Sequence, residues 1–242
     1  MVGAAPIKKL SGWEDYGWGV KLGIVRLSSG VSKNLRRFHS IGSRRKNCWL
    51  YLEILNQMPK IVDRTFFNGT NERLDRLGLR GIWQELETLL VSFELLVLEK
   101  KDSNGGAAVR VFLDTRFREV GGWENRATGG VDWTKCHIVN GTKVCLGVEI
   151  QFSARSDLLI VDVQHLRDEI TAGRIDVGVI VVPSNHLAYF LTDRVARYTD
   201  AVKAVERARA SDLPLAVIAL EHDGAGPSLI KRQTRQGKKS SL

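Results

Sequence analysis

Residues 131–152, VDWTKCHIVNGTKVCLGVEIQF, constrain the fold of this chain more than any other segment. Two runs rich in β-branched and apolar residues flank the dipeptide Asn140-Gly141. Asn-Gly is typical of a two-residue β-turn, because both central residues of that turn need a positive φ angle. The segment therefore predicts a β-hairpin in which Val139 lies opposite Thr142.

This pairing brings two carboxylates together. Counting away from the turn, Asp132 lies opposite Glu149, with Cβ atoms about 4.5–5.5 Å apart on one face of the hairpin. Gln151 falls on the same face, two residues further along its strand. The opposite face is expected to join the core, and it comprises Val131, Trp133, Val139, Val144, Leu146, Val148, Ile150 and Phe152.

Like charges that face each other across a sheet repel, so the two acids need a compensating cation. Two carboxylates with an amide oxygen nearby are ligands suited to Mg²⁺, which is the cofactor that we expect. The alternative is that both acids stand at the exposed end of a hairpin and pair with Lys135 or Lys143. The hairpin alone leaves both interpretations open.

The remaining sequence predicts further helices and strands. Helical periodicity marks residues 81–101 and, less strongly, residues 48–58, whereas residues 108–113 are expected to form a strand. After the hairpin we expect a helix at about 156–171, a strand at 175–182, a helix at about 192–210 and a strand at 213–220. The last two strands, IDVGVIVVP and LPLAVIALE, are apolar enough to be covered on both faces. The expected fold class is α/β, with a mixed central sheet flanked by helices.

A chain of 242 residues can form one domain. We expect a single domain over residues 1–230, with a helical N-terminal part at about 1–101 and an α/β core at about 107–222. Residues 231–242 are expected to form a basic tail. The formal net charge of +9 favours a polyanionic partner, foremost nucleic acid, although an ordinary basic protein is an alternative of equal weight.

The sequence contains no apolar run of roughly 20 residues and no recognisable signal peptide, so neither a membrane partner nor secretion is expected. Three cysteines are too few for a disulfide framework and fit a reducing compartment. Cys136 lies opposite Cys145 in the predicted register and could pair with it or, with His137, bind zinc. Two buried free thiols are the preferred interpretation.

The hairpin, with an Asp opening one strand and Glu-x-Gln on the next, resembles the PD-(D/E)XK nucleases. The motifs VDW and VEIQF are most similar to the restriction endonuclease branch that includes BglII and BamHI, in which Gln or Glu replaces the usual Lys. The resemblance covers roughly residues 123–182. It implies a restriction endonuclease-like fold and a type II enzyme of a restriction-modification system in a prokaryotic cytoplasm.

The resemblance also implies roles for individual residues. Asp132, Glu149 and the carbonyl of Ile150 would bind Mg²⁺, and Gln151 would orient water or a phosphate oxygen. Gln151 has no titrating proton and cannot act as the general base. An acidic or amide residue ahead of Asp132 is also expected in this branch, and Glu124 or Glu119 could fill that role. On the helix after the motif, Asp162 and His165 could form an acid–base pair, although an exposed helix surface is the preferred interpretation.

DNA contacts are expected from the loops that flank the motif and from the N-terminal basic stretch. The candidates near the motif are Asn125, Arg126, Ser153 and Arg155, and those expected to bind phosphates are Arg36, Arg37, Arg44, Arg45 and Lys46. The function expected is cleavage of double-stranded DNA at a palindromic site by a homodimer, leaving 5′-phosphates. The alternatives are a structure-selective or repair nuclease with the same core, and a non-catalytic DNA-binding module.

Overall fold

A computed structural model of the chain describes residues 60–125, 130–153, 156–192 and 194–231. All of these residues belong to one compact unit, Arg45–Leu242. The expected helix at 48–58, the five basic residues of the N-terminal stretch, Arg126, Arg155 and the tail beyond Lys231 lie outside the described residues.

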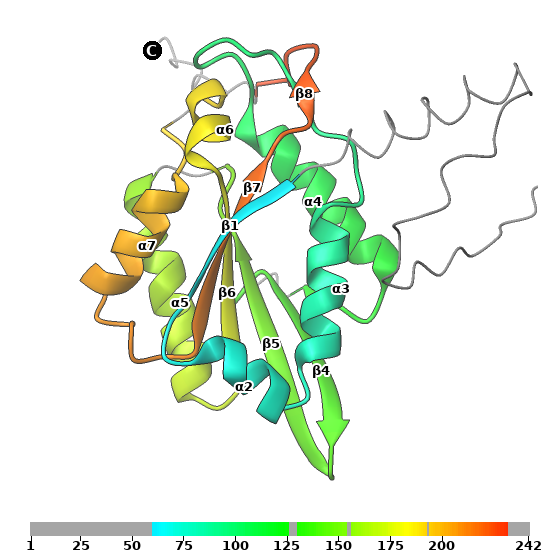
Figure 1. Ribbon diagram of the computed structural model, residues 1–242, viewed down its shortest axis with the longest axis vertical. Coiled ribbons are helices and arrows are strands. Elements are labelled where there is room, and N and C mark those ends of the chain that lie inside the picture. The colour runs from blue at the N-terminus through cyan, green and yellow to red at the C-terminus, as the bar shows by residue number, and fades with distance from the viewer. Residues whose placement is uncertain (1–59, 126–129, 154–155, 193, 232–242) are drawn as a thin grey trace, which may run out of the picture. The chain divides into compact units, whose positions relative to one another are not determined.

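A six-stranded mixed sheet forms the centre of this unit (Figure 1), with the strand order β1-β7-β6-β5-β4-β3. Strands β5, β6 and β7 run parallel to one another, while β1, β4 and β3 pair antiparallel with their neighbours. The strands are β1 (Lys60–Phe66), β3 (Glu124–Asn125), β4 (Trp133–Val139), β5 (Thr142–Ile150), β6 (Val177–Pro183) and β7 (Leu215–Glu221). Two short strands form a separate parallel pair, β2 (Leu96–Val97) and β8 (Gly224–Ala225).

Helices cover both faces of the sheet. In Figure 1, α3 and α4 lie on one side of the strands, and α5 and α7 lie on the other. The helices are α2 (Thr70–Arg76), α3 (Arg80–Leu90), α4 (Gly106–Val120), α5 (Leu159–Thr171), α6 (Asn185–Phe190) and α7 (Tyr198–Arg207), and a 3₁₀ turn, η1 (Ser156–Leu158), precedes α5. Each face buries its own apolar cluster. The predicted α/β class with a mixed sheet flanked by helices is confirmed.

The predicted hairpin is present as β4 and β5. Asn140 and Gly141 form its turn with φ angles of 50° and 81°, and Val139 pairs with Thr142 as expected. The strands predicted at 175–182 and 213–220 correspond to β6 and β7, which are buried along almost their whole length. The assignment of Val131 to the predicted core face is wrong. Val131 precedes β4 and packs in the other apolar cluster, beneath α5 and α7.

The segment expected to be a strand at 108–113 is instead part of the helix α4. Val109, Leu113 and Phe117 recur at every fourth position and are fully buried, whereas Val111 and Phe112 between them are exposed. This spacing places one apolar stripe on the sheet, which a strand with alternating faces would not do. The error matters because α4 carries two residues of the site described below.

The helix expected over 81–101 ends early, as α3 at Leu90. Beyond it the chain extends so that Leu95 and Val97 are buried and β2 pairs with β8. The backbone N–H of Leu95 donates to the Asp223 carboxylate over 2.7 Å. These long-range contacts outweigh the local helical pattern. The part expected to be helical also contains β1, which pairs antiparallel with β7.

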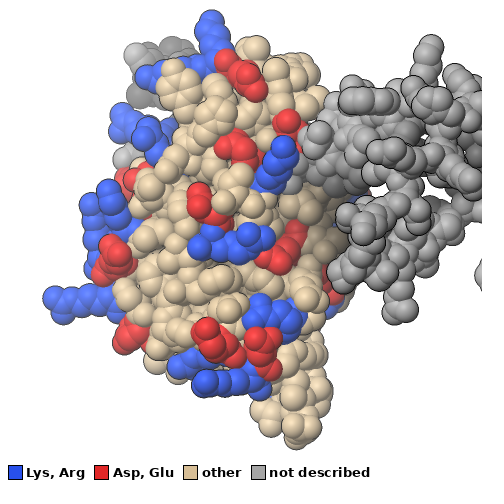
Figure 2. Space-filling model, in the orientation of Figure 1, with Lys and Arg blue, Asp and Glu red and all other residues tan. Residues whose placement is uncertain are grey.

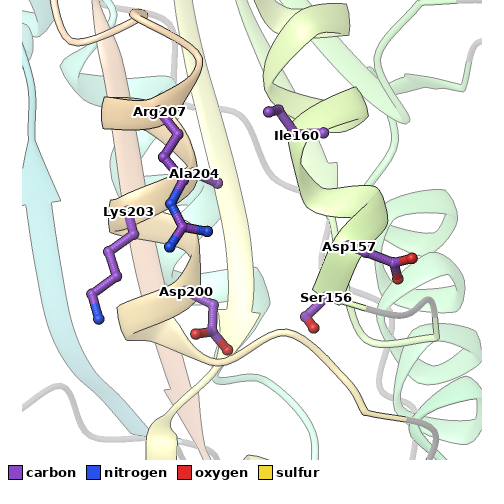
Figure 3. Close-up of a pocket in the computed structure, with 7 residues that line it drawn as sticks. All are labelled: Ser156, Asp157, Ile160, Asp200, Lys203, Ala204 and Arg207. Carbon is purple, nitrogen blue, oxygen red and sulfur yellow. The ribbon is translucent and has the colours of Figure 1, made fainter.

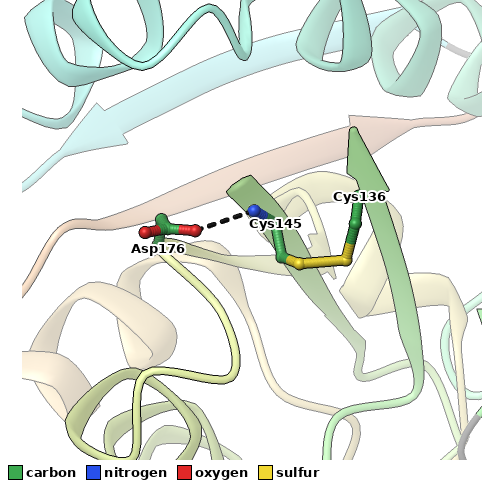
Figure 4. Close-up of a disulfide and its surroundings, with 3 residues drawn as sticks. All are labelled: Cys136, Cys145 and Asp176. Carbon is green, nitrogen blue, oxygen red and sulfur yellow. Dashed lines mark hydrogen bonds between the residues drawn. A yellow bond between two sulfur atoms is a disulfide. The ribbon is translucent and has the colours of Figure 1, made fainter. Parts of the chain in front are cut away.

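The two cysteines of the hairpin form a disulfide (Figure 4), so the expectation of free thiols is wrong. Cys136 and Cys145 are register partners with Cα atoms 4.1 Å apart, and both side chains point to the same face. The backbone N–H of Cys145 donates to the carboxylate of Asp176 over 2.7 Å. The predicted register was therefore right, and only the chemistry assigned to the pair was not.

The start of α4 packs directly against the end of β5. A Cβ atom on Gly106 would lie 1.9 Å from the carbonyl oxygen of Phe152, so only glycine permits this approach. Further along α4, the Phe117 ring stacks on Trp133 of β4, with ring centroids 5.0 Å apart. The helix is thereby fixed over the hairpin at both ends. Within the described ranges, no helix has the length and apolar character needed to cross a membrane.

Candidate active site

The two acids of the hairpin meet where β5 ends. Asp132 directly precedes β4, and Glu149 is the second-last residue of β5. Trp133 pairs with Val148, so the next pair in register joins Asp132 to Glu149. After burial, the neighbouring Asp132 carboxylate is the next largest cause of the raised pKa of Glu149, as expected for two facing acids. The structure therefore brings these two predicted residues together on one face.

An arginine of α4 joins this pair. The Arg110 guanidinium donates two hydrogen bonds to the Asp132 carboxylate, 2.8 and 2.9 Å long, and a third to the Ile150 carbonyl over 2.8 Å. The backbone N–H of Ile150 donates to Asp132 over 2.8 Å. The Asp132 carboxylate and the Ile150 carbonyl thus converge on one cationic group.

Asp114, one turn further along α4, completes the arginine's contacts. Arg110 Nε lies 2.9 and 3.0 Å from its two carboxylate oxygens, and the indole N–H of Trp133 donates to it over 3.0 Å. Asp114 is thus an acid ahead of Asp132 that shares Arg110 with it. Sequence analysis missed Arg110 and Asp114, although their i,i+4 spacing is a helical ion-pair signal.

Helix α5 adds two further residues. Burial and, to a smaller extent, the Asp132 charge raise the pKa of Asp162 to about 7, although Arg110 opposes them. One Asp162 oxygen is buried without a hydrogen-bond partner, as is Oε1 of Glu149. His165 Nδ1 lies 3.5 Å from that same Glu149 atom, and the imidazole is largely exposed. Asp162 and His165 therefore border the acidic pair.

Among the described residues, the carboxyl groups of this site outnumber its arginine. Burial raises the pKa of Glu149 well above its usual value, and the nearby Asp132 and Asp162 carboxylates add to the effect. The Glu149 side chain is only 6% exposed, so water screens it little. Three carboxylates with two unpartnered oxygens form a site that attracts a cation.

The BglII/BglIII restriction endonuclease family matches residues 68–220 of the chain, which is more than half of its length. The chain belongs to this family. None of the curated proteins searched matches it. Family membership makes the chain a DNA-binding nuclease. The match includes α4, the β4–β5 hairpin and α5, which supply all the residues of the site described in this subsection.

The other predicted site residues are distributed around this centre. Gln151 directly follows β5, is 5% exposed, and donates its backbone N–H to the Val181 carbonyl over 2.9 Å. Glu124 lies exposed on β3 opposite Thr134, and no hydrogen bond or ion pair joins it to Asp132 or Glu149 within the described ranges. Glu119, the other candidate, pairs instead with Arg116 on α4.

Two of the four predicted DNA contacts near the motif are described. Asn125 on β3 is exposed, and its amide donates to the Asp132 backbone carbonyl over 3.0 Å. Ser153 is exposed and lines a cavity of about 470 Å³ together with Arg110 and Asp114. The remaining lining residues are Ala107, Ala108, Val111 and Ile230. This cavity opens from solvent onto the arginine of the site.

A second cavity, of about 450 Å³, lies between α7 and the start of α5 (Figure 3). Its lining residues are Ser156, Asp157, Ile160, Asp200, Lys203, Ala204 and Arg207. It contains neither Asp132 nor Glu149, so it is separate from the acidic pair. Figure 2 shows Lys and Arg side chains standing out along the margin where α7 lies, with acidic and basic groups mixed elsewhere on that face.

Proposed function

We propose that the protein is a type II restriction endonuclease that uses Mg²⁺ to cleave double-stranded DNA at a palindromic site and leaves 5′-phosphates. The observation that carries this proposal is that Asp132, directly before β4, lies opposite Glu149 of β5. The Ile150 carbonyl lies beside Asp132, since both accept a hydrogen bond from the same nitrogen of Arg110. The family membership of the chain supplies the nuclease activity; the ion, the symmetry of the site and the products are the proposed part.

The donor set fits a hard divalent cation. Arg110 stands in for such a cation, because its guanidinium binds both Asp132 and the Ile150 carbonyl. Glu149 Oε1 and one oxygen of Asp162 are buried and accept no hydrogen bond, so further oxygen ligands are available. Mg²⁺ prefers oxygen ligands and is commonly held by one or two carboxylates. Asp132, Glu149 and the Ile150 carbonyl are the residues that would hold it.

When bound, Mg²⁺ would supply acidification of a water molecule and charge neutralisation at the scissile phosphate. The chain's own residues position the reactants. Gln151 offers an amide that can orient water or a phosphate oxygen, and it cannot remove a proton. Arg110 carries a positive charge with a fork geometry suited to phosphate, so it can bind the DNA backbone once it leaves Asp132.

Cleavage of both strands requires two centres. We propose that a homodimer provides them through its two-fold symmetry.

The described residues carry no excess of Lys and Arg over Asp and Glu, so the net charge of +9 arises from the residues outside those ranges. The basic residues Arg36, Arg37, Arg44, Arg45 and Lys46 are proposed to bind phosphates, and Asn125, Arg126, Ser153 and Arg155 to lie nearest the bases.

A digest of a sequenced plasmid that lacks base methylation tests this function. Wild-type protein with Mg²⁺ should give discrete fragments whose mapped ends share one palindromic sequence and carry 5′-phosphates, and EDTA should abolish them. Asp132→Asn should not cut, whereas Asp168→Asn, an exposed aspartate on α5, should cut normally. Cleavage of branched or damaged DNA alone would contradict the proposal in favour of a structure-selective nuclease. DNA binding without any cleavage would favour a non-catalytic module.

A further inference from the structure

Two imidazoles and a carboxylate meet at the edge of the sheet where β6 and β7 end. His186 lies in α6, which follows β6, whereas Glu221 is the last residue of β7 and His222 comes next. Because β6 and β7 are parallel neighbours with Pro183 opposite Leu220, the segments that follow them lie side by side. One ligand atom from each of the three residues lies within 4.8 Å of the other two.

The spacing of these atoms suits a small tetrahedral ion. His186 Nδ1 lies 3.4 Å from Glu221 Oε2, and His222 Nδ1 is in direct contact with Glu221 Oε1. Ligand atoms of a tetrahedral zinc ion, with bonds of about 2.0–2.1 Å, stand roughly 3.3 Å from one another. The His186–Glu221 distance already matches this spacing, whereas His222 would have to exchange its hydrogen bond to Glu221 for the ion.

A second observation supports a metal site: the side chains around it are arranged as supports for ligands. His222 directs Nδ1 to the cluster and places Nε2 3.1 Å from the carboxylate of Glu99. The buried hydroxyl of Ser184 donates to Glu221. A histidine ligand that donates its other ring N–H to a carboxylate is the usual arrangement at zinc, because it fixes the tautomer and the ring orientation.

The alternative explanation is a plain ion-pair network of Glu99, His222 and Glu221. In that network His186 is peripheral: its side chain is 64% exposed, against 4% for His222, and its ring packs against Phe190 and His222. The exposed imidazole nevertheless turns Nδ1 toward the Glu221 carboxylate. His186 is therefore the residue that distinguishes a metal site from a salt-bridge cluster.

We propose that His186, Glu221 and His222 bind one Zn²⁺ ion, with water in the fourth position. Two nitrogen ligands and one carboxylate suit zinc and its neighbours Co²⁺ and Ni²⁺, whereas Mg²⁺ prefers oxygen alone. The site is distinct from the acidic pair of the nuclease centre and shares no residue with it. The ion would join α6 to the end of β7, at the same edge of the sheet where β5 presents Glu149.

Metal binding to the full-length protein tests this proposal. The Asp132→Asn variant serves as the background, so that the nuclease centre does not compete for the ion. After EDTA treatment and dialysis, titration with Zn²⁺ by calorimetry should show one equivalent, and Co²⁺ should give the intense visible absorption of a tetrahedral complex. Adding His186→Ala should abolish both signals. Adding His137→Ala, which removes an imidazole from the hairpin instead, should change neither.

The surrounding residues give a graded test. Glu99→Gln should weaken Zn²⁺ binding by about 10–100-fold without changing its stoichiometry, because it removes only the support for His222. Absence of a bound equivalent in the Asp132→Asn background would overturn the proposal, as would unchanged affinity in the His186→Ala variant. His186 is exposed, so its replacement should not prevent folding. Nuclease activity is not the readout, so the two proposals can fail separately.

Discussion

The Arg110 guanidinium binds the Asp132 carboxylate through two hydrogen bonds of 2.8 and 2.9 Å. The same guanidinium reaches the Ile150 carbonyl and Asp114, so one side chain binds two of the groups that are proposed to hold the metal, Asp132 and the Ile150 carbonyl. Helix α4 thereby supplies the positive charge that balances Asp132 in the metal-free protein. Binding of Mg²⁺ must displace this cation or share Asp132 with it, which leads to the first prediction.

Arg110→Met should lower the free energy of unfolding of the metal-free protein by about 2 kcal/mol, because it leaves two partly buried carboxylates without their partner. Mg²⁺ should then stabilise the variant more than the wild type, since the ion replaces the missing charge. Urea unfolding with and without Mg²⁺ measures both effects.

Arg116→Met is the matched control, because Arg116 sits on the same helix in an exposed pair with Glu119. It should change the stability by less than about 1 kcal/mol and leave the response to Mg²⁺ as in the wild type. An equal stabilisation of all three proteins by Mg²⁺ would show that Arg110 does not occupy the site of the ion.

The two acids of the pair should respond differently to neutralisation. Asp132→Asn should destabilise the metal-free protein by about 2 kcal/mol, because Arg110 loses two charge-assisted hydrogen bonds. Glu149→Gln should instead stabilise it at pH 8, because burial and the neighbouring Asp132 and Asp162 raise the pKa of Glu149, so that at this pH the fold must protonate a carboxyl that is ionised in the unfolded chain. Both variants should lose cleavage by on the order of 10²-fold or more. Denaturant unfolding and plasmid cleavage, measured on the same preparations, check this contrast.

The raised pKa of Asp162 gives a dependence on pH. A carboxyl whose folded pKa is about 7, above its usual 3.8, contributes most to stability below pH 3.8, and this contribution is lost as the pH rises from 3.8 to about 7. Asp162→Asn should therefore flatten the fall in the stability of the metal-free protein between about pH 4 and pH 7. Mg²⁺ affinity should rise over the same range in the wild type, because the ion competes with protons. A stability profile that is identical in the two proteins would rule out this assignment.

Reduction of the Cys136–Cys145 disulfide should have a limited effect. The bond spans nine positions of a hairpin that its Asn-Gly turn already closes. Opening so short a covalent loop should lower the free energy of unfolding by no more than about 2–3 kcal/mol. Asp132 should stay opposite Glu149. Thermal unfolding with and without a reductant, with Cys136→Ser as a check, measures this. Loss of cleavage on reduction at a temperature where the protein stays folded would contradict it.

The hairpin, its register and the opposed acids could be predicted from the sequence because they depend on local chemistry. Asn140 and Gly141 adopt the turn that their positive φ angles allow, and this fixes every pair along β4 and β5. The late strands were predictable for a similar reason, since their apolar runs are long enough to be buried on both faces.

The partners of Asp132 could not be predicted in the same way. Arg110 and Asp114 reach the site only because α4 folds back over the hairpin, and that depends on the close approach of Gly106 to Phe152. An alternating pattern at 108–113 concealed the helix, and with it the ion pair. Asp162 was noticed on its helix, but its burial beside Glu149 depends on how α5 packs against the sheet.

The position of the divalent ion tests the central claim most directly. Crystals of the full-length protein grown with Mn²⁺ in place of Mg²⁺ should show an anomalous scattering peak within about 2.0–2.3 Å of oxygens from Asp132 and Glu149. The Ile150 carbonyl should complete this ligand set, and Arg110 should have left it. A site that remains occupied by Arg110, with no peak between Asp132 and Glu149 at saturating Mn²⁺, would contradict the claim.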